Sequence, residues 1–255
     1  MVDTHCHLYD EAFDTDRDDA VKRAVAVGVD MMLLPGIDSK SHAQQESLAT
    51  QYPQYFRQMM GLHPTSVDDN FESELSIVEQ KLFDPASRYV GVGEIGLDLY
   101  WDKTYLEQQR EVLKRQMHWA RELDLPVCLH VRKAYNELFG LLRDLGFGTY
   151  RGVMHCFGGS VQEAHKAVEM GFHLGIGGVV TFKNATMAEV VAAVPLQSLL
   201  LETDAPYLAP VPYRGKRNES SYIPVIAEKV AQIKGITLDE VAAVTTASAQ
   251  HLFGL

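Results

Sequence analysis

The feature that most constrains the fold is a regular alternation of short apolar segments with longer amphipathic ones along the whole chain. The short segments are apolar or β-branched and are bounded by Gly, Pro or Asp, which is typical of buried β-strands. The sequence predicts strands at residues 1–7, 31–36, 57–63, 89–94, 126–130, 152–155, 172–175 and 198–202.

A helical pattern follows each predicted strand. In residues 105–123, apolar side chains recur at Leu106, Leu113, Met117 and Ala120, which places them on one face of a helix. Similar patterns occur near residues 15–27, 39–51, 71–83, 134–144, 160–170, 185–193 and 221–233. A last helix is expected from residue 237 to residue 252, and Thr237 with Glu240 has the spacing of a capping box at its start.

Eight strands, each followed by a helix, predict an α/β fold, a single-domain (β/α)8 TIM barrel with an extra C-terminal helix. The chain shows no internal repeat of fixed period, no low-complexity segment and no linker that would divide it. Its 255 residues, 46% hydrophobic and 22% charged, have an ordinary globular composition. We therefore expect one barrel over residues 1–255.

Composition and charge restrict the class of function. A formal net charge of −11 argues against a protein that coats nucleic acid through a broad basic surface, but not against an enzyme that acts on it at one local site. No apolar run approaches the roughly 18 residues that span a bilayer, and no signal-peptide pattern precedes the first strand. Three cysteines without a C-x-x-C pair favour a reduced, cytoplasmic setting. No membrane association and no obligate protein partner are indicated.

Polar side chains follow the predicted strands at the points where those strands end. Only the second and seventh strands end without a histidine or a carboxylate. In TIM barrels the chemistry lies at the carboxyl ends of the strands, so these side chains are expected to meet. The residues concerned are His5, His7, His63, Glu94, Asp98, His130, His155, Glu202 and Asp204.

The residue types at these strand ends favour a metal site. His5 and His7, in the segment DTHCH, project from the same face of a strand because alternate side chains share a face. Imidazoles mixed with carboxylates suit Zn, Mn, Fe or Ni. Four histidines and two carboxylates exceed the needs of one tetrahedral zinc and suit two ions that share a carboxylate. Two ions roughly 3.5–4 Å apart hold a bridging hydroxide and polarise a phosphoryl or carbonyl oxygen. The residues therefore predict a binuclear metal hydrolase.

The order and spacing of several motifs resemble one family over the whole chain, from Val2 to Leu255. The motifs DTHCH, GLHP, GEIGLD, LHVR, HCFGG and ETDAPYL are similar to those of the TatD family of metal-dependent nucleases, a branch of the amidohydrolase superfamily. The resemblance implies a metal-dependent phosphodiester hydrolase. It implies a 3′–5′ exodeoxyribonuclease that acts on single-stranded DNA ends with two divalent ions, Mg²⁺, Mn²⁺ or Zn²⁺, and a bridging hydroxide.

The resemblance also assigns roles to residues. It implies that Glu94 bridges the two ions, and that Asp204 is a ligand that also orients or deprotonates the attacking water. It implies that His63 contacts the substrate phosphate or stabilises developing charge, so that Asp204, Glu94 and His63 are the catalytic residues. The full set of implied metal ligands is His5, His7, Glu94, His130, His155 and Asp204.

The substrate-binding residues that the resemblance implies are His63, Arg132, Tyr207, Arg214 and Asn218. Tyr207, Arg214 and Asn218 lie in a long segment after the eighth strand. For Lys216 and Arg217 in the same segment, the alternative is a run of charged side chains exposed to solvent. This segment departs from the family pattern because Ser rather than Pro follows its Arg-Asn-Glu run, which bears on substrate choice.

Four further residues have two interpretations each. Glu202 is expected to hydrogen-bond a metal ligand, or to end its strand in a salt bridge. Asp98 is interpreted as a structural cap in preference to a residue that orients a ligand. Tyr100 and Trp101 would stack on a base or pack the barrel rim.

Two alternative functions remain open. The same centre suits a metal-dependent ester or amide hydrolase, for example one that deacylates aminoacyl-tRNA or opens a small lactone or cyclic amide. A non-catalytic scaffold is disfavoured because every expected ligand position holds a competent ligand.

Overall fold

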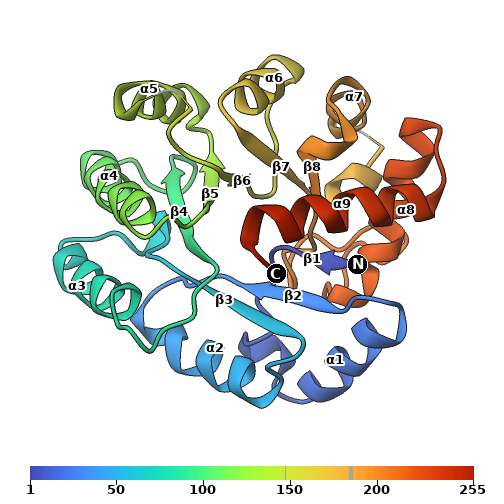
Figure 1. Cartoon of the computed structure of the whole chain (residues 1–255), viewed down its shortest axis with the longest axis horizontal. Coiled ribbons are helices and arrows are strands. Elements are labelled where there is room, and N and C mark those ends of the chain that lie inside the picture. Colours follow the sequence, from blue (N-terminus) through green and yellow to red (C-terminus); the bar gives the residue numbers. More distant parts are fainter. Residues whose placement is uncertain (147, 184–185) are drawn as a thin grey trace.

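The computed structural model describes residues 1–146, 148–183 and 186–255. Eight parallel strands lie side by side in chain order, and the helices surround them (Figure 1). The strands are β1 (Val2–Asp3), β2 (Met31–Leu34), β3 (Phe56–Met60), β4 (Gly91–Asp98), β5 (Val127–Arg132), β6 (Gly152–Met154), β7 (Phe172–Ile176) and β8 (Leu199–Leu201).

The barrel closes between β1 and β8 through backbone hydrogen bonds. The Thr4 N–H donates to the Leu201 carbonyl over 3.0 Å, and the Asp204 N–H donates to the His5 carbonyl over 2.9 Å. These bonds join the first strand to the last, so the predicted (β/α)8 barrel is confirmed. They also bring the segment that follows β8 against the two histidines that follow β1.

The first eight α-helices each follow the strand of the same number, and α9 is the predicted extra helix. Their bounds agree closely with the expected ranges, although the expected helix at 185–193 begins at a residue outside the described ones. The helices are α1 (Arg17–Ala26), α2 (Ser39–Gln51), α3 (Phe71–Leu82), α4 (Leu106–Glu122), α5 (Tyr135–Leu145), α6 (Val161–Glu169), α7 (Met187–Ala193), α8 (Ile223–Lys234) and α9 (Leu238–Phe253). None of these helices is both long and apolar enough to cross a bilayer, in the part of the chain described.

Side-chain caps fix the start of several helices. The predicted capping box at α9 is confirmed: Thr237 accepts a hydrogen bond from the Glu240 N–H, and the Glu240 carboxylate accepts one from the Thr237 N–H. Ser160 and Glu163 form the same arrangement at α6. A cap of this kind stabilises a helix by about 1 kcal/mol, because it satisfies N–H groups that have no partner inside the helix.

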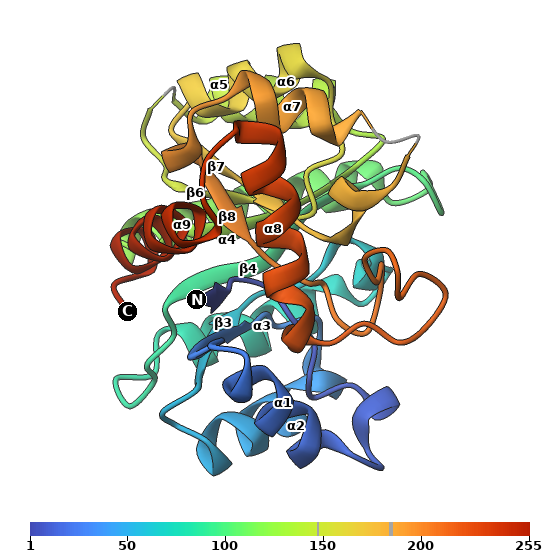
Figure 2. The ribbon, with the colours of Figure 1, turned by 90° about the vertical axis from the view of Figure 1, so that its right-hand side faces the viewer.

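The amino end of the barrel is closed by α9, which crosses it in Figure 1, and both chain termini lie at this end (Figure 2). Ala249, Leu252 and Phe253 of α9 pack in one buried cluster with side chains of the strands, namely Val2, Leu33, Met59, Cys128, Val153 and Leu200. A larger apolar cluster lies between the strands and the outer helices. The opposite end is therefore the one left for chemistry.

Strands β4 and β5 run further than the sequence predicts. Beyond their neighbours they pair only with each other, in the register Gly96 to His130 and Asp98 to Arg132. The sequence predicts that these strands end at Glu94 and His130. Glycine weakens strand propensity, and the pairing of β4 with β5 overrides that preference at Gly96. Gly96 is required here, since a Cβ atom would lie 1.9 Å from the His130 carbonyl oxygen. We call this ribbon of residues 96–98 and 130–132 the β4–β5 extension.

Candidate metal centre

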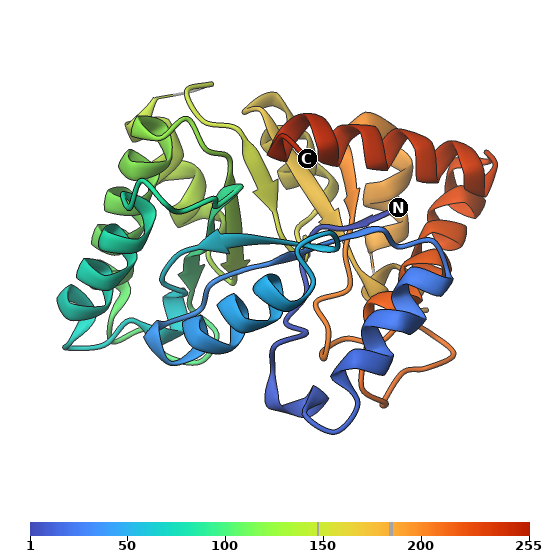
Figure 3. The same ribbon diagram turned by 60° about the horizontal axis from the view of Figure 1, so that its bottom comes forward.

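A pocket of about 1070 Å³ opens at the carboxyl end of the barrel. Its lining includes Tyr9 and Asp10 after β1 and Tyr207 and Leu208 after β8. The loops that carry them lie on the side of the molecule opposite the termini (Figure 3). The pocket lining also includes all the predicted ligands except His5, which is fully buried beneath the others. The structure thus brings the six predicted ligands together, as the strand-end argument expected.

Glu94 lies at the middle of this centre, and its two carboxylate oxygens face different imidazoles. Oε2 faces the two histidines that follow β1 and lies 3.1 Å from His5 Nε2 and 3.9 Å from His7 Nε2. Oε1 is directed to the other side, where the neighbouring nitrogens are His130 Nδ1 at 2.9 Å, His63 Nε2 at 3.2 Å and His155 Nε2 at 3.6 Å. A carboxylate in this position can bridge two cations.

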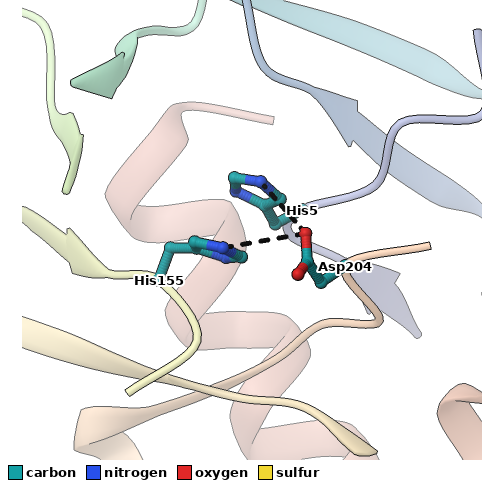
Figure 4. Close-up of side chains that lie close together, drawn as sticks. All are labelled: His5, His155 and Asp204. Carbon is teal, nitrogen blue, oxygen red and sulfur yellow. Dashed lines mark ion pairs between the residues drawn. The ribbon is translucent and has the colours of Figure 1, made fainter. Parts of the chain in front are cut away.

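Asp204 approaches the same centre from the segment after β8. Its Oδ1 lies 3.4 Å from His7 Nε2, 3.8 Å from His5 Nε2 and 3.7 Å from His155 Nε2. Figure 4 shows Asp204, His5 and His155 converging from three different strand ends. The backbone of Asp204 has a φ of +58°, a conformation that side-chain-bearing residues seldom adopt and that clusters at functional sites.

Hydrogen bonds outside the centre turn ligand lone pairs toward it. The Tyr9 hydroxyl donates to the Pro35 carbonyl over 2.7 Å, so at 2.8 Å it must accept from His7 Nδ1. With its hydrogen on Nδ1, His7 presents the lone pair of Nε2 to Glu94 and Asp204. This is how proteins fix the tautomer of a metal-binding histidine.

Two more histidines are held by carboxylates. His130 Nε2 contacts Asp98 Oδ2 at 2.9 Å, which leaves Nδ1 facing Glu94. His155 Nδ1 lies 3.0 Å from Glu202 Oε1, which leaves Nε2 facing the centre. The interpretation of Asp98 as a structural cap was therefore incomplete, because its second oxygen orients His130.

His63 differs from the other four histidines. Its Nδ1 accepts a hydrogen bond from the Thr65 backbone N–H over 3.1 Å, so the hydrogen of the neutral ring lies on Nε2. That Nε2 is 3.2 Å from Glu94 Oε1. His63 therefore offers a hydrogen-bond donor to the pocket, whereas His7 offers a lone pair.

The buried carboxylates of the centre need compensating positive charge. Burial would raise the pKa of Glu94, but His63, His5 and His155 outweigh it and hold that pKa well below its usual range. Burial would lower the pKa of His155, but Glu202, Glu94 and Asp204 raise it to about 10. Buried ionised carboxylates are stable only when cations or hydrogen bonds compensate them. This donor set fits divalent metal ions, which would take the place of the proton that His155 otherwise holds between the carboxylates.

Glu202 is fully buried and also accepts a hydrogen bond of 2.6 Å from the Cys156 backbone N–H. Room for its carboxylate comes from β7, because a Cβ atom on Gly175 would lie 2.1 Å from Glu202 Oε2. The glycine there makes space for a residue that contacts His155.

The predicted substrate-binding residues divide into two groups. His63, Arg132 and Tyr207 line the pocket, whereas Arg214 and Asn218 are absent from its lining as the described residues define it. Arg214 lies 4.5 Å above the ring of Phe182. Asn218 is buried, and its amide donates to the carbonyls of Thr203 and Tyr207, so it holds the loop after β8 and contacts no open space. Direct substrate contact by Asn218 does not fit this geometry.

Tyr9 and Thr65, which set the tautomers of His7 and His63, were not among the predicted site residues. Each follows its histidine by two residues. His5 Nδ1 lies 3.3 Å from Cys128 Sγ, a contact that no local pattern indicates because the two residues are far apart in the chain.

Comparison with known proteins agrees with this geometry. The model of the family described as TatD-related DNase matches residues 2–254. The chain belongs to the TatD family. The uncharacterized metal-dependent hydrolase YabD of Bacillus subtilis is 38% identical to it, over 99% of this chain and 98% of YabD. The protein named 3′-5′ ssDNA/RNA exonuclease TatD in Erwinia amylovora is 34% identical over the full length of both chains.

The TatD fold is also shared in detail. The crystal structure of YjjV, a TatD homologue from Escherichia coli K12, superposes with a TM-score of 0.93 at 32% identity, covering 100% of this chain and 98% of YjjV. The resemblance inferred from the motifs is confirmed, and this TatD-family protein is a metal-dependent hydrolase.

Proposed function

We propose that this TatD-family pocket hydrolyses the phosphodiester bond at the 3′ end of single-stranded DNA with the help of two divalent cations. The observation that carries the proposal is the position of Glu94, whose two oxygens face separate sets of imidazole nitrogens. The relative named as a 3′-5′ single-strand exonuclease supports the choice of substrate.

The proposed ligands of the first ion are His5, His7, Glu94 and Asp204, and those of the second are Glu94, His130 and His155. When bound, the cations would polarise the phosphoryl group, neutralise its charge and make a water molecule more acidic. Mg²⁺, Mn²⁺ and Zn²⁺ are the ions to test.

The residues of the chain would supply the remaining steps. Glu94 stays ionised throughout, because the imidazoles around it hold its pKa low. Asp204 would accept the proton of the attacking water, since its Oδ1 is at the centre and its carboxylate is ionised: His155 and His7 outweigh the effect of burial and lower its pKa. His63 would donate the hydrogen on Nε2 to a phosphoryl oxygen and so stabilise the charge that develops there.

The test is a matched nuclease assay. Single-stranded DNA labelled at its 5′ end is incubated with Mg²⁺ or Mn²⁺ and wild-type protein, beside Glu94→Gln. Glu137→Gln serves as control, because Glu137 lines the same pocket away from the centre. Wild type and the control should shorten the strand from its 3′ end, and Glu94→Gln should lose roughly 10³-fold or more in rate.

A thermal-shift measurement separates the metal centre from the substrate. Mn²⁺ should raise the Tm of the wild type, since an ion that binds only the folded state stabilises it, and should not raise that of Glu94→Gln. Metal binding without DNA cleavage would contradict the proposed substrate and would direct the search to esters, amides and lactones. Equal cleavage by wild type and Glu94→Gln would contradict the proposed centre.

A further inference from the structure

Three side chains form a continuous aromatic and cationic surface at the rim of the pocket, outside the metal centre. We call Tyr100, Trp101 and Arg132 the rim platform. The Arg132 guanidinium carbon lies 3.8 Å from the centre of the Tyr100 ring and 5.2 Å from that of Trp101. The two rings are 4.9 Å apart and nearly perpendicular. Trp101 and Arg132 both line the pocket.

The rim platform is open to solvent. Trp101 is 72% exposed and Tyr100 is 50% exposed, whereas Trp119, the other tryptophan of the chain, is 7% exposed. Tryptophan gains more from burial than almost any other side chain, so an exposed one beside a pocket offers a contact surface. Arg132 forms no ion pair with any described residue, so its positive charge can interact with a ligand. Packing of the rim, the alternative interpretation of these aromatic residues, does not account for this exposure.

The rim platform is fixed relative to the metal centre. It sits at the tip of the β4–β5 extension, where Asp98 pairs with Arg132 and the Leu99 N–H donates to the Arg132 carbonyl over 2.9 Å. One carboxylate joins the two sites: Asp98 Oδ2 contacts His130 Nε2 at 2.9 Å, and Asp98 Oδ1 accepts from the Tyr100 N–H at 2.9 Å. A ligand on the platform is thereby held at a set distance from the cleavage centre.

We propose that the rim platform stacks an unpaired nucleobase of the strand whose phosphate lies at the metal centre, and thereby selects single-stranded ends. This inference rests on the proposed function. Base stacking on aromatic side chains is tolerant of sequence, because every base has a π-face, and an arginine beside the rings attracts the phosphate backbone. Inside a duplex both faces of a base are covered by its neighbours and the terminal pair leaves only one face open, whereas an unpaired base can turn out of the strand to dock, so the platform favours unpaired ends.

The experiment compares two single strands labelled at the 5′ end, which carry the same phosphates. One is ordinary DNA, and in the other the nucleotides near the 3′ end are abasic. Wild type should cleave the ordinary strand with a kcat/KM roughly 5- to 150-fold higher, the range expected for one stacked base. Trp101→Ala should lower this ratio at least fivefold, and Trp101→Phe should keep most of it. Phe83→Ala, an exposed aromatic residue at the opposite end of the barrel, is the matched control.

A binding measurement gives a second readout that does not need cleavage. With metal removed by EDTA, Trp119→Phe leaves Trp101 as the only tryptophan, and its fluorescence is followed as each strand is added. The ordinary strand should quench it at lower concentration than the abasic strand does. In Trp101→Phe, where Trp119 alone remains, neither strand should change the signal.

The outcomes separate this inference from the proposed function. Cleavage of both strands at equal rates, with an unchanged ratio in Trp101→Ala, would overturn the rim platform and leave the nuclease activity standing. If wild type cleaves neither strand, the proposed function fails and fluorescence decides the inference. Quenching that depends on the bases would then support a nucleobase site, and quenching that does not would overturn it.

Discussion

The two ends of the barrel are built from the same eight strands and have opposite character. At the amino end, Val2, Leu200 and Phe253 belong to a dry apolar cluster that α9 closes. At the carboxyl end, Glu94 and Asp204 are ionised carboxylates surrounded by imidazoles. The difference shows that burial stabilises one end, whereas matched charge makes burial tolerable at the other.

Backbone conformation follows the same division. Among the described residues that are not glycine, the following have positive φ at or after strand ends on the pocket side: Lys133, Cys156, Asp204 and Leu208. Asp124, before β5, is the one on the other side. Local strain of this kind costs of order 1–3 kcal/mol per residue and persists where the surrounding structure enforces it. The apolar clusters at the amino end and between the strands and the helices offset that cost.

The largest effect that tests this division is expected from Phe253→Ala at the amino end. Removing a buried aromatic ring leaves a cavity and should lower the free energy of unfolding by about 3–5 kcal/mol. DNA cleavage per folded molecule should not change, because the ring is remote from the pocket. Urea unfolding and an activity assay on the same samples check both. Leu238→Ala, at the exposed start of the same helix, is the control, and an equal loss of stability in it would contradict the assigned role of α9.

A smaller effect is expected from Asp98→Asn at the carboxyl end. Losing the carboxylate that orients His130 should weaken metal binding roughly 10- to 100-fold, while unfolding in EDTA should change little. Calorimetric titration with Mn²⁺ measures the affinity. Asp102→Asn, an exposed carboxylate of the same loop that caps the Thr104 N–H, should bind metal as the wild type does. An affinity of Asp98→Asn within twofold of wild type would show that Asp98 is only a cap.

The smallest effect concerns Asp3, which lies between the two ends and links β1 to Thr203 by hydrogen bonds of 2.6 and 3.0 Å. Burial raises its pKa to about 7, against hydrogen bonds that lower it. The folded state therefore holds a proton that the unfolded state releases near pH 4. The stability due to this group should fall as pH rises from about 4 to 7 and then stay level.

Asp3→Asn should remove that slope. Relative to wild type, the variant should gain roughly 2 kcal/mol between pH 5 and pH 8 in metal-free buffer, as measured by urea unfolding. The stability of Asp144→Asn, which alters an exposed carboxylate 3.5 Å from Arg143, should follow that of wild type at every pH. If the Asp3→Asn and wild-type stabilities stayed parallel over this pH range, Asp3 would be ionised in the folded protein and its neighbours would compensate the charge.

The sequence by itself determined the barrel and the kind of chemistry. The eightfold alternation of strand and helix patterns depends on local spacing, which the chain carries directly. The convergence of His5, Glu94, His130 and Asp204 follows from the same pattern, because parallel strands of a barrel end at one rim. Residue type and strand position together were therefore enough to predict a metal centre.

Tertiary structure alone decided how these groups are used. Asn218 looks like a binding residue in a basic run, but the path of the loop buries its amide against backbone carbonyls. Asp98 looks like a cap, but the extended pairing of β4 with β5 brings its second oxygen to His130. Which nitrogen of His63 carries the hydrogen depends on a contact with Thr65 that only coordinates reveal. Such details depend on register and on distances between segments remote in the chain, which local spacing does not encode.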